Sequence, residues 1–269
     1  MLTAIIKSFL NRRKLTAMSQ VDVDSPESIT IHQQIIADNP ILMECYRIWY
    51  GEFLPAVAAT RMLAPLPMIE LGCGASHLEK YIPDIVKTDC VAHPNAHAVV
   101  DAQALPYPDN SLRAVFMTAV LHHLSDPEKC LREIERCLAP GGRLVLIEPS
   151  NSFLEKWIIN RFSPYEFHDD SIAEWKGAPT GRLSAANTAL GWVVLVRDEK
   201  LFFQKFPHFR LVRRRYHTFS TYYLSGGVSF RPFIPGSWRP LVRAFECLAR
   251  PLHPWLGGAL TVDLEKISA

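Results

Sequence analysis

The sequence predicts an α/β protein with a Rossmann-like, seven-stranded doubly wound mixed sheet. Three observations predict this fold. An apolar stretch at 68–71 runs into a glycine-containing turn at 72–74, further short apolar runs alternate with helical patterns, and the run 259–267 alternates between apolar and polar residues. In such a fold the last strand is antiparallel. We expect N-terminal helices before the sheet and insertions after strands five and six.

Length and composition suit one large globular domain. The chain has 269 residues, of which 48% are hydrophobic and 21% charged, and its formal net charge is +2. This near-neutral charge does not indicate a nucleic-acid partner. The six cysteines form no C-x-x-C pair, which is typical of reduced intracellular thiols, and no apolar run is long enough to span a membrane. We therefore expect a cytoplasmic protein.

Residues 1–64 are expected to form an N-terminal extension and cap helices, and residues 65–269 the sheet-containing domain. The first 20 residues place apolar side chains on one helical face and basic ones after it. This pattern fits a short helix on an anionic membrane surface, or an extension without a role, which we favour. Apolar residues recur at helical spacing from 40 to 63, where Pro55 should break or kink the helix.

The glycine turn predicts a nucleotide-binding corner. Glycine accepts a positive φ and lets another molecule approach the backbone. Residues 77–82 can begin a helix after the turn, and the free N–H groups of a helix start favour anionic ligands. A dinucleotide fingerprint needs a third glycine where His77 stands, and the Gly-Lys-Ser/Thr of a P-loop is absent, so both motifs are disfavoured.

The next strands are predicted from apolar runs. The second strand, 85–88, ends in Asp89, which is where the diol of a ribose would lie. A third strand within 97–106 ends in Asp101, and a fourth is expected at 112–117. A helix at 128–138 follows the capping residue Asp126, and a fifth buried strand covers 143–148.

The most specific pattern begins at Leu121 and reads L-H-H-L-S-D-P-E, followed by L-R-E-I-E-R-C-L-A-P-G-G-R-L-V-L-I-E-P. Together with Glu70, the glycine turn and Asp89, it resembles the class I S-adenosylmethionine-dependent methyltransferases, in particular the branch that acts on small molecules and lipids. The resemblance covers about residues 65–150. It implies S-adenosylmethionine as the cofactor and S-adenosylhomocysteine as the product.

The resemblance also implies roles for individual residues. The glycine turn would lie under the methionine part of the cofactor, Asp89 would bind the ribose, and Asp101 with the backbone N–H of Ala102 would bind adenine. An acid beside a free N–H matches the adjacent donor and acceptor of adenine. The predicted cofactor-binding residues are Glu70, Gly72, Cys73, Gly74, Asp89, Cys90, Asp101, Ala102, Thr118 and His122.

Three histidines are candidate catalytic residues. His122 and His123 follow the fourth strand, where the family places the sulfonium end of the cofactor. In an extended stretch the two rings point to opposite sides, so we expect no shared metal ion. Each is a candidate general base or a part of the pocket wall, and His168 is a third candidate base for an oxygen acceptor.

Two segments, 151–206 and 219–258, are expected as substrate-side insertions. The second is rich in aromatic and arginine residues, which fits a bilayer interface, a pocket for an acyl or polyprenyl chain, or equally a second small core. Between and after them, 209–218 predicts the sixth strand and 259–267 the seventh.

The predicted function is transfer of a methyl group from S-adenosylmethionine to O, N or C of a small-molecule or lipid-type acceptor, with peripheral membrane contact as an open question. Two rival functions also stay open. One is a non-catalytic protein of the same fold that is a partner in a cell-envelope or glycolipid pathway, and the other is an NAD-dependent oxidoreductase. The sequence Thr118–Leu121 stands where a nucleic-acid methyltransferase would carry N/D-P-P-Y, which disfavours that class.

Overall fold

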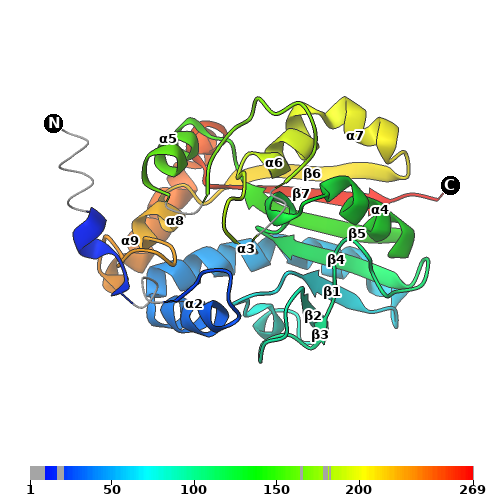
Figure 1. The fold of residues 1–269 in the computed structure, drawn as a ribbon, viewed down its shortest axis with the longest axis horizontal. Coiled ribbons are helices and arrows are strands. Elements are labelled where there is room, and N and C mark those ends of the chain that lie inside the picture. Colours follow the sequence, from blue (N-terminus) through cyan, green and yellow to red (C-terminus); the bar gives the residue numbers. More distant parts are fainter. Residues whose placement is uncertain (1–9, 17–20, 164–165, 178–180, 182, 269) are drawn as a thin grey trace.

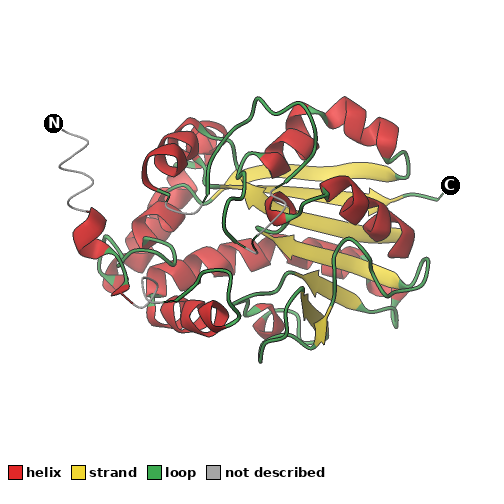
Figure 2. Ribbon diagram, viewed as in Figure 1, coloured by secondary structure: helices red, strands yellow, loops and turns green. Residues whose placement is uncertain are grey.

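The computed structural model describes residues 10–16, 21–163, 166–177, 181 and 183–268. Within these residues a seven-stranded sheet lies between helices on both of its faces (Figures 1 and 2). Most of the predicted amphipathic segment 1–20 lies outside the described residues. Among those described, no helix combines the length and the apolar composition needed to cross a bilayer.

The strands follow the order β3-β2-β1-β4-β5-β7-β6. Their bounds are β1 Met68–Leu71, β2 Ile85–Asp89, β3 Ala98–Val99, β4 Leu112–Thr118, β5 Leu138–Pro149, β6 Phe209–His217 and β7 Ala259–Lys266. Strands β1 to β5 pair in parallel, and β7 lies antiparallel between β5 and β6. The predicted fold class, including the antiparallel last strand, is confirmed.

The helices divide between the faces of the sheet and its carboxyl end. Their bounds are α2 Glu27–Asp38, α3 Pro40–Ala59, α4 Pro127–Cys137, α5 Phe153–Phe162, α6 Leu190–Trp192, α7 Glu199–Lys205, α8 Ser220–Ser225, α9 Arg239–Leu248 and α10 His253–Leu256. Short 3-10 turns cover Arg61–Leu63, Leu78–Lys80, Leu121–His123, Gly236–Trp238 and Arg250–Leu252, and a π-helical turn covers Val193–Arg197. In Figure 1, α2, α5 and α8 lie beyond the carboxyl ends of the parallel strands.

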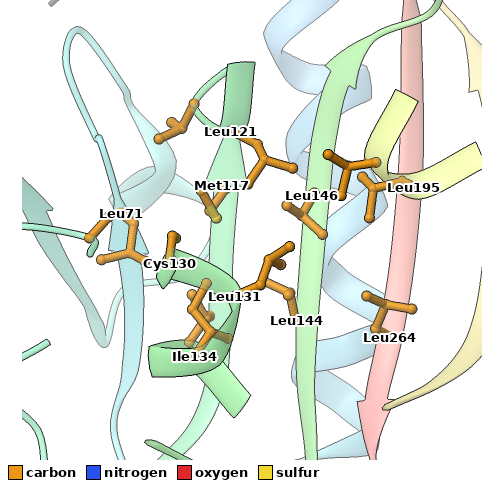
Figure 3. Close-up of a cluster of buried hydrophobic side chains, with 14 of the residues drawn as sticks. Leu71, Met117, Leu121, Cys130, Leu131, Ile134, Leu144, Leu146, Leu195 and Leu264 are labelled. Atoms are coloured by element: carbon orange, nitrogen blue, oxygen red, sulfur yellow. The ribbon is translucent and has the colours of Figure 1, made fainter. Parts of the chain in front are cut away.

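The central strands are buried on both faces, which is why they read as continuous apolar runs. On one face α3 places Phe53 against Phe116 of β4, with ring centroids 4.8 Å apart. On the other face α4 packs Leu131 and Ile134 against the strands near Leu144 (Figure 3). The predicted cap of α4 is confirmed, because the side chain of Asp126 accepts from the Lys129 N–H at 2.9 Å.

Four local predictions differ from the structure. Residues 77–82 form one 3-10 turn instead of a helix, because Pro83 follows and the chain enters β2 two residues later. Helix α3 continues through Pro55, whose lost carbonyl partner, Gly51, is exposed to water like Pro55 itself. Strand β3 has only two residues. Strand β5 begins at Leu138, with a register shift before Arg143.

The two predicted insertions differ in how much of each lies at the carboxyl end of the sheet. Residues 219–258 form α8 to α10 at the carboxyl end of the sheet (Figure 1). Of residues 151–206, α5 and parts of the loop after it, such as Glu166 and Leu183, lie there, whereas α6, the π-helical turn and α7 pack apolar side chains into the main core. The division into domains stays a prediction.

Candidate active site

A cavity of about 770 Å³ lies at the carboxyl ends of the parallel strands. Open α/β sheets bind ligands at this edge. The strand ends supply the polar part of the lining. Helices α2, α5 and α8 and the segment 226–233 supply the apolar part, with Ile29, Ile36, Trp157, Ile158, Ile159, Phe162, Tyr222, Tyr223, Val228, Phe230 and Phe233.

All ten predicted cofactor-binding residues line this one cavity. They are Glu70, Gly72, Cys73, Gly74, Asp89, Cys90, Asp101, Ala102, Thr118 and His122. They come together because β1, β2 and β4 are neighbours and parallel, so residues at their carboxyl ends share one edge of the sheet. Their individual roles stay predictions.

The glycine turn requires glycine for two different reasons. At Gly72 φ is +65°, and a Cβ would lie 2.7 Å from a methyl carbon of Val120. At Gly74 φ is +42°, and a Cβ would meet nothing within 4 Å. The backbone at Gly74 therefore has open space beside it, which a ligand can approach.

Asp89 is fixed at the end of β2. Its Oδ2 accepts a hydrogen bond from the Gly74 N–H at 2.8 Å and lies 3.4 Å from Nε2 of His93. The side chain is buried yet lines the cavity. Its Oδ1 has only long contacts, 3.4 Å to the Val91 nitrogen and 3.5 Å to Sγ of Cys90, so this oxygen can still accept shorter hydrogen bonds from a diol.

Two further polar groups face the cavity. Thr118 has a buried Oγ1 without a hydrogen-bond partner. Asp101 is exposed, and its Oδ1 accepts from the Gln103 N–H at 2.8 Å, which holds the carboxylate beside Ala102. Buried polar atoms are rarely left without partners, so Thr118 marks a place for a ligand atom.

Glu70 carries an unusual carboxyl group. It is buried at the end of β1, and its Oε2 has no hydrogen-bond partner. Burial raises the pKa of Glu70 to about 8, although a hydrogen bond with Ser76 and the charge of Lys87 lower it. A cationic or hydrogen-bond-donating ligand in the cavity would compensate this carboxyl.

Substitution Glu70→Gln should flatten the pH dependence of stability. The unfolded carboxyl ionises near its ordinary pKa of 4.5, whereas the folded one retains its proton until about pH 8. Between these values the folded state binds more protons, so the free energy of unfolding falls as pH rises, by up to about 1.4 kcal/mol per pH unit. Urea unfolding at pH 5 to 9 measures this. Parallel pH curves for the variant and the unsubstituted protein would contradict it.

The expectation that His122 and His123 point to opposite sides is wrong. The stretch is a 3-10 turn and not a strand, so the ring centroids lie only 4.1 Å apart. Both rings line the cavity, with His122 buried and His123 partly buried.

Glu148, at the end of β5, holds His122 in place. Its Oε2 lies 2.6 Å from Nδ1 of His122, and its Oε1 accepts from the N–H groups of Val120 and Leu121 at 3.0 and 2.8 Å. Burial lowers the pKa of His122, but the charge and hydrogen bond of Glu148 outweigh it and raise that pKa to about 10. His122 is thus protonated at neutral pH and is unsuited to accept a proton.

Glu148 was not predicted as a site residue. A signal for it exists, because it ends a buried strand in the same way as Asp89. Glu166, whose Oε1 lies 3.7 Å from Nε2 of His122, was also missed. It follows α5 in a loop without periodicity, so no local pattern indicates it.

His168 is not brought to the cavity. Its Nδ1 lies 2.8 Å from Oγ1 of Thr188 and its Nε2 lies 2.6 Å from Oδ1 of Asn151, so both ring nitrogens join segments of the insertion. Burial lowers its pKa to about 4. His168 therefore does not reach the predicted acceptor site.

Comparison with known proteins relates part of the chain to a protein family. Residues 69–146 match the family model of a methyltransferase domain. The ubiquinone/menaquinone biosynthesis C-methyltransferase UbiE of Enterobacter sp. (strain 638) is 38% identical over 68 residues, which are 25% of this chain and 27% of that protein. UbiE of Escherichia coli (strain K12 / DH10B) is 37% identical over the same length. The match thus spans about a quarter of these relatives.

Among solved structures, a SAM-dependent methyltransferase from Archaeoglobus fulgidus aligns with a TM-score of 0.45 and 12% identity, over 82% of this chain and 94% of its own. The residues present fit S-adenosylmethionine, because the backbone beside Gly74 is open and Glu70 offers an unpartnered buried oxygen to a cation. The methyltransferase-domain match over residues 69–146, the strand order and the glycine turn with its acids support a class I S-adenosylmethionine-dependent methyltransferase.

Proposed function

We propose that this protein transfers a methyl group from S-adenosylmethionine to an O, N or C atom of an apolar, lipid-type acceptor at a membrane surface. The observation that carries the proposal is the divided lining of the cavity. Its strand ends offer hydrogen-bonding groups for a nucleoside, and α5, α8 and the segment 226–233 offer aromatic and aliphatic side chains.

At the polar end, the chain would bind and orient the cofactor. Asp89 would accept from the ribose hydroxyls, Asp101 and Ala102 would bind adenine, and the turn at Gly72–Gly74 would lie under the methionine part. S-adenosylmethionine supplies an electrophilic methyl group, so the protein has mainly to align the acceptor and exclude water. A site that mainly aligns its ligands needs cofactor-binding residues more than it needs a reactive side chain.

At the apolar end, the lining argues against an anionic acceptor. No lysine or arginine occurs among the described residues that line the cavity. Recognition of a phosphate or carboxylate usually relies on such cations. Aromatic side chains such as Trp157, Phe162 and Phe233 instead favour a hydrophobic body.

The surface next to the cavity supports a membrane-resident acceptor. Leu241, Phe245 and Leu248 of α9 are 64%, 52% and 80% exposed and recur at helical spacing, so they form one apolar stripe. Phe153, Trp157, Trp238, Leu252 and Trp255 are also exposed, and their elements join α9 through a chain of contacts: Gly236–Trp238 and Arg250–Leu252 contact α9, α10 contacts Arg250–Leu252, and α5 contacts α10. We call these five residues and the three of the stripe the apolar surface patch. A patch of this kind marks an interaction surface, and amphipathic helices bury such faces in the lipid headgroup region.

One feature favours an anionic membrane as the partner of the apolar surface patch, and a second connects the patch to the cavity. Arg239 and Arg250, beside it in sequence, are exposed. Trp157 belongs to the patch and also lines the cavity, while α5, which carries it, contacts α10. An acceptor embedded in the bilayer would thus have an apolar path into the site. The UbiE relatives are named for ubiquinone and menaquinone biosynthesis, which agrees with an apolar acceptor.

The double substitution Leu241→Glu/Phe245→Glu should reduce binding to anionic lipid vesicles at least tenfold. Burial of one Leu or Phe is worth roughly 1.5–3 kcal/mol, and a carboxylate in its place is also repelled by the lipid charge. Vesicle co-sedimentation measures the effect. Met62→Glu is the matched control, because Met62 is 92% exposed and lies outside the patch. Equal sedimentation of both variants would refute the membrane contact.

The activity itself is tested with methyl-labelled S-adenosylmethionine and membrane lipid extracts. We expect label in products that partition into organic solvent. Binding of the cofactor and of vesicles without any transfer of label would contradict the catalytic proposal and favour the non-catalytic partner protein.

A further inference from the structure

We propose that His122, His123 and Glu166 together bind a divalent transition-metal ion inside the cavity. One ligand atom from each of these residues lies within 4.8 Å of the others, and all three residues line the cavity. We call them the His–His–Glu cluster. The two histidines come from the 3-10 turn after β4, and Glu166 comes from the loop after α5.

The geometry of the cluster is close to that of a metal site. Nε2 of His122 and Oε1 of Glu166 are 3.7 Å apart. Two ligand atoms, each about 2.1 Å from one ion, are about 3.4 Å apart at a tetrahedral angle. The observed separation thus needs only a small movement of the Glu166 side chain. His123 is beside His122 because the 3-10 turn brings their rings to a centroid separation of 4.1 Å.

Glu148 supplies the outer partner that metal-binding histidines usually have. It lies 2.6 Å from Nδ1 of His122, which leaves Nε2 directed at Glu166. A carboxylate on one ring nitrogen fixes the orientation of the imidazole and makes the other nitrogen a better ligand. Glu148 is itself fixed by two backbone N–H groups.

The local charge also suits a divalent cation. Once an ion replaces the proton on His122, the two imidazoles are neutral, and Glu148 and Glu166 together carry two negative charges. The described cavity lining contains no lysine or arginine that would repel the ion. Two histidines and one carboxylate leave coordination positions open, as in zinc and iron(II) sites of enzymes. An open position would let the ion bind an oxygen atom of the acceptor as a Lewis acid.

A second group of ligand-type residues provides an internal comparison. Cys73, Asp89 and His93 also lie close together. There, however, Nδ1 of His93 accepts from the Asn95 N–H at 3.3 Å, so the ring proton is on Nε2, the nitrogen that faces Asp89. An ion could not take the place of that proton without breaking the Asn95 contact. The His–His–Glu cluster is therefore the better site.

Cobalt(II) is the probe that separates these sites. The full chain, without an affinity tag and dialysed against a chelator, is titrated with Co²⁺ while visible absorption is recorded. We expect one equivalent to bind with d–d bands and without a sulfur-to-cobalt charge-transfer band. His123→Ala and Glu166→Gln should each weaken Co²⁺ binding at least tenfold. Cys73→Ala should leave the affinity unchanged.

Several results would overturn the site. These are absence of Co²⁺ binding, a sulfur charge-transfer band, loss of affinity in Cys73→Ala, or unchanged affinity in both His123→Ala and Glu166→Gln. Because His123 and Glu166 are only partly buried, their variants should fold, which circular dichroism verifies. No step of the test uses methyl transfer, so its outcome is independent of the proposed function.

Discussion

Substitution Asp89→Ala should lower the affinity for S-adenosylmethionine about 100-fold or more. The carboxylate would lose hydrogen bonds to two ribose hydroxyls, and bonds to a charged group contribute about 1.5–3 kcal/mol each. Since about 1.4 kcal/mol corresponds to a tenfold change, two such bonds account for the expected loss. Isothermal titration calorimetry measures the dissociation constant directly.

The matched control for this experiment is Asp84→Ala. Asp84 is an exposed acid in the turn before the same strand, so its removal should not change the affinity. Asp89 also accepts from the Gly74 N–H, and thermal melting must show that the variant is folded. Unchanged affinity in a folded Asp89→Ala protein would disprove the ribose assignment.

Substitution Glu148→Ala should lower the free energy of unfolding by about 3–5 kcal/mol. Removing one partner of a buried ion pair leaves the other charge uncompensated, which costs about that much. The change would also leave the N–H groups of Val120 and Leu121 without their acceptor. The pocket around Glu148 is tightly packed, because a Cβ on Gly191 would lie 2.7 Å from its Cγ. Urea unfolding measures the loss.

The Glu148 prediction has two comparisons. Glu174→Ala removes an acid whose side chain is 68% exposed and should change stability by less than about 0.5 kcal/mol. Glu148→Gln keeps a hydrogen-bond acceptor for the backbone but loses the charge, so the pKa of His122 should fall, as followed by NMR. A Glu148→Ala protein as stable as Glu174→Ala would show that the ion pair is not a stabilising element.

The predicted part of the site rests on local signals. Gly72, Gly74 and Asp89 stand directly at the ends of apolar runs, and parallel strands bring such ends to one edge. The sequence order of these signals therefore suffices to place them in one cavity. Glu148 carries the same signal, because it lies next to the carboxyl end of β5.

Other features depend on long-range packing or on short-range geometry that periodicity does not encode. Glu166 reaches His122 from an irregular loop, and His168 is held by Thr188 and Asn151 in a place that no spacing indicates. The 3-10 turn at His122 and His123 alters the direction of both rings. These two histidines follow β4, so the preceding strand alone predicts an extended backbone and misses the turn.

The segment 190–205 illustrates a further limit. It is apolar and follows the fifth strand, which predicts a position on the substrate side, yet Leu195 and Phe202 pack into the main core. An apolar run indicates burial without indicating the partner. In contrast, the exposed stripe of α9 follows from its helical spacing only once the burial of Val242 and Glu246 shows which face is inward.

S-adenosylmethionine should occupy the corner made by Gly72, Gly74 and Asp89. Calorimetric titration of the intact protein with S-adenosylmethionine, S-adenosylhomocysteine and NADH tests it. We predict one site for each of the two sulfur compounds and no heat of binding for NADH. Binding of NADH, or of none of the three, would contradict this assignment of the cofactor site.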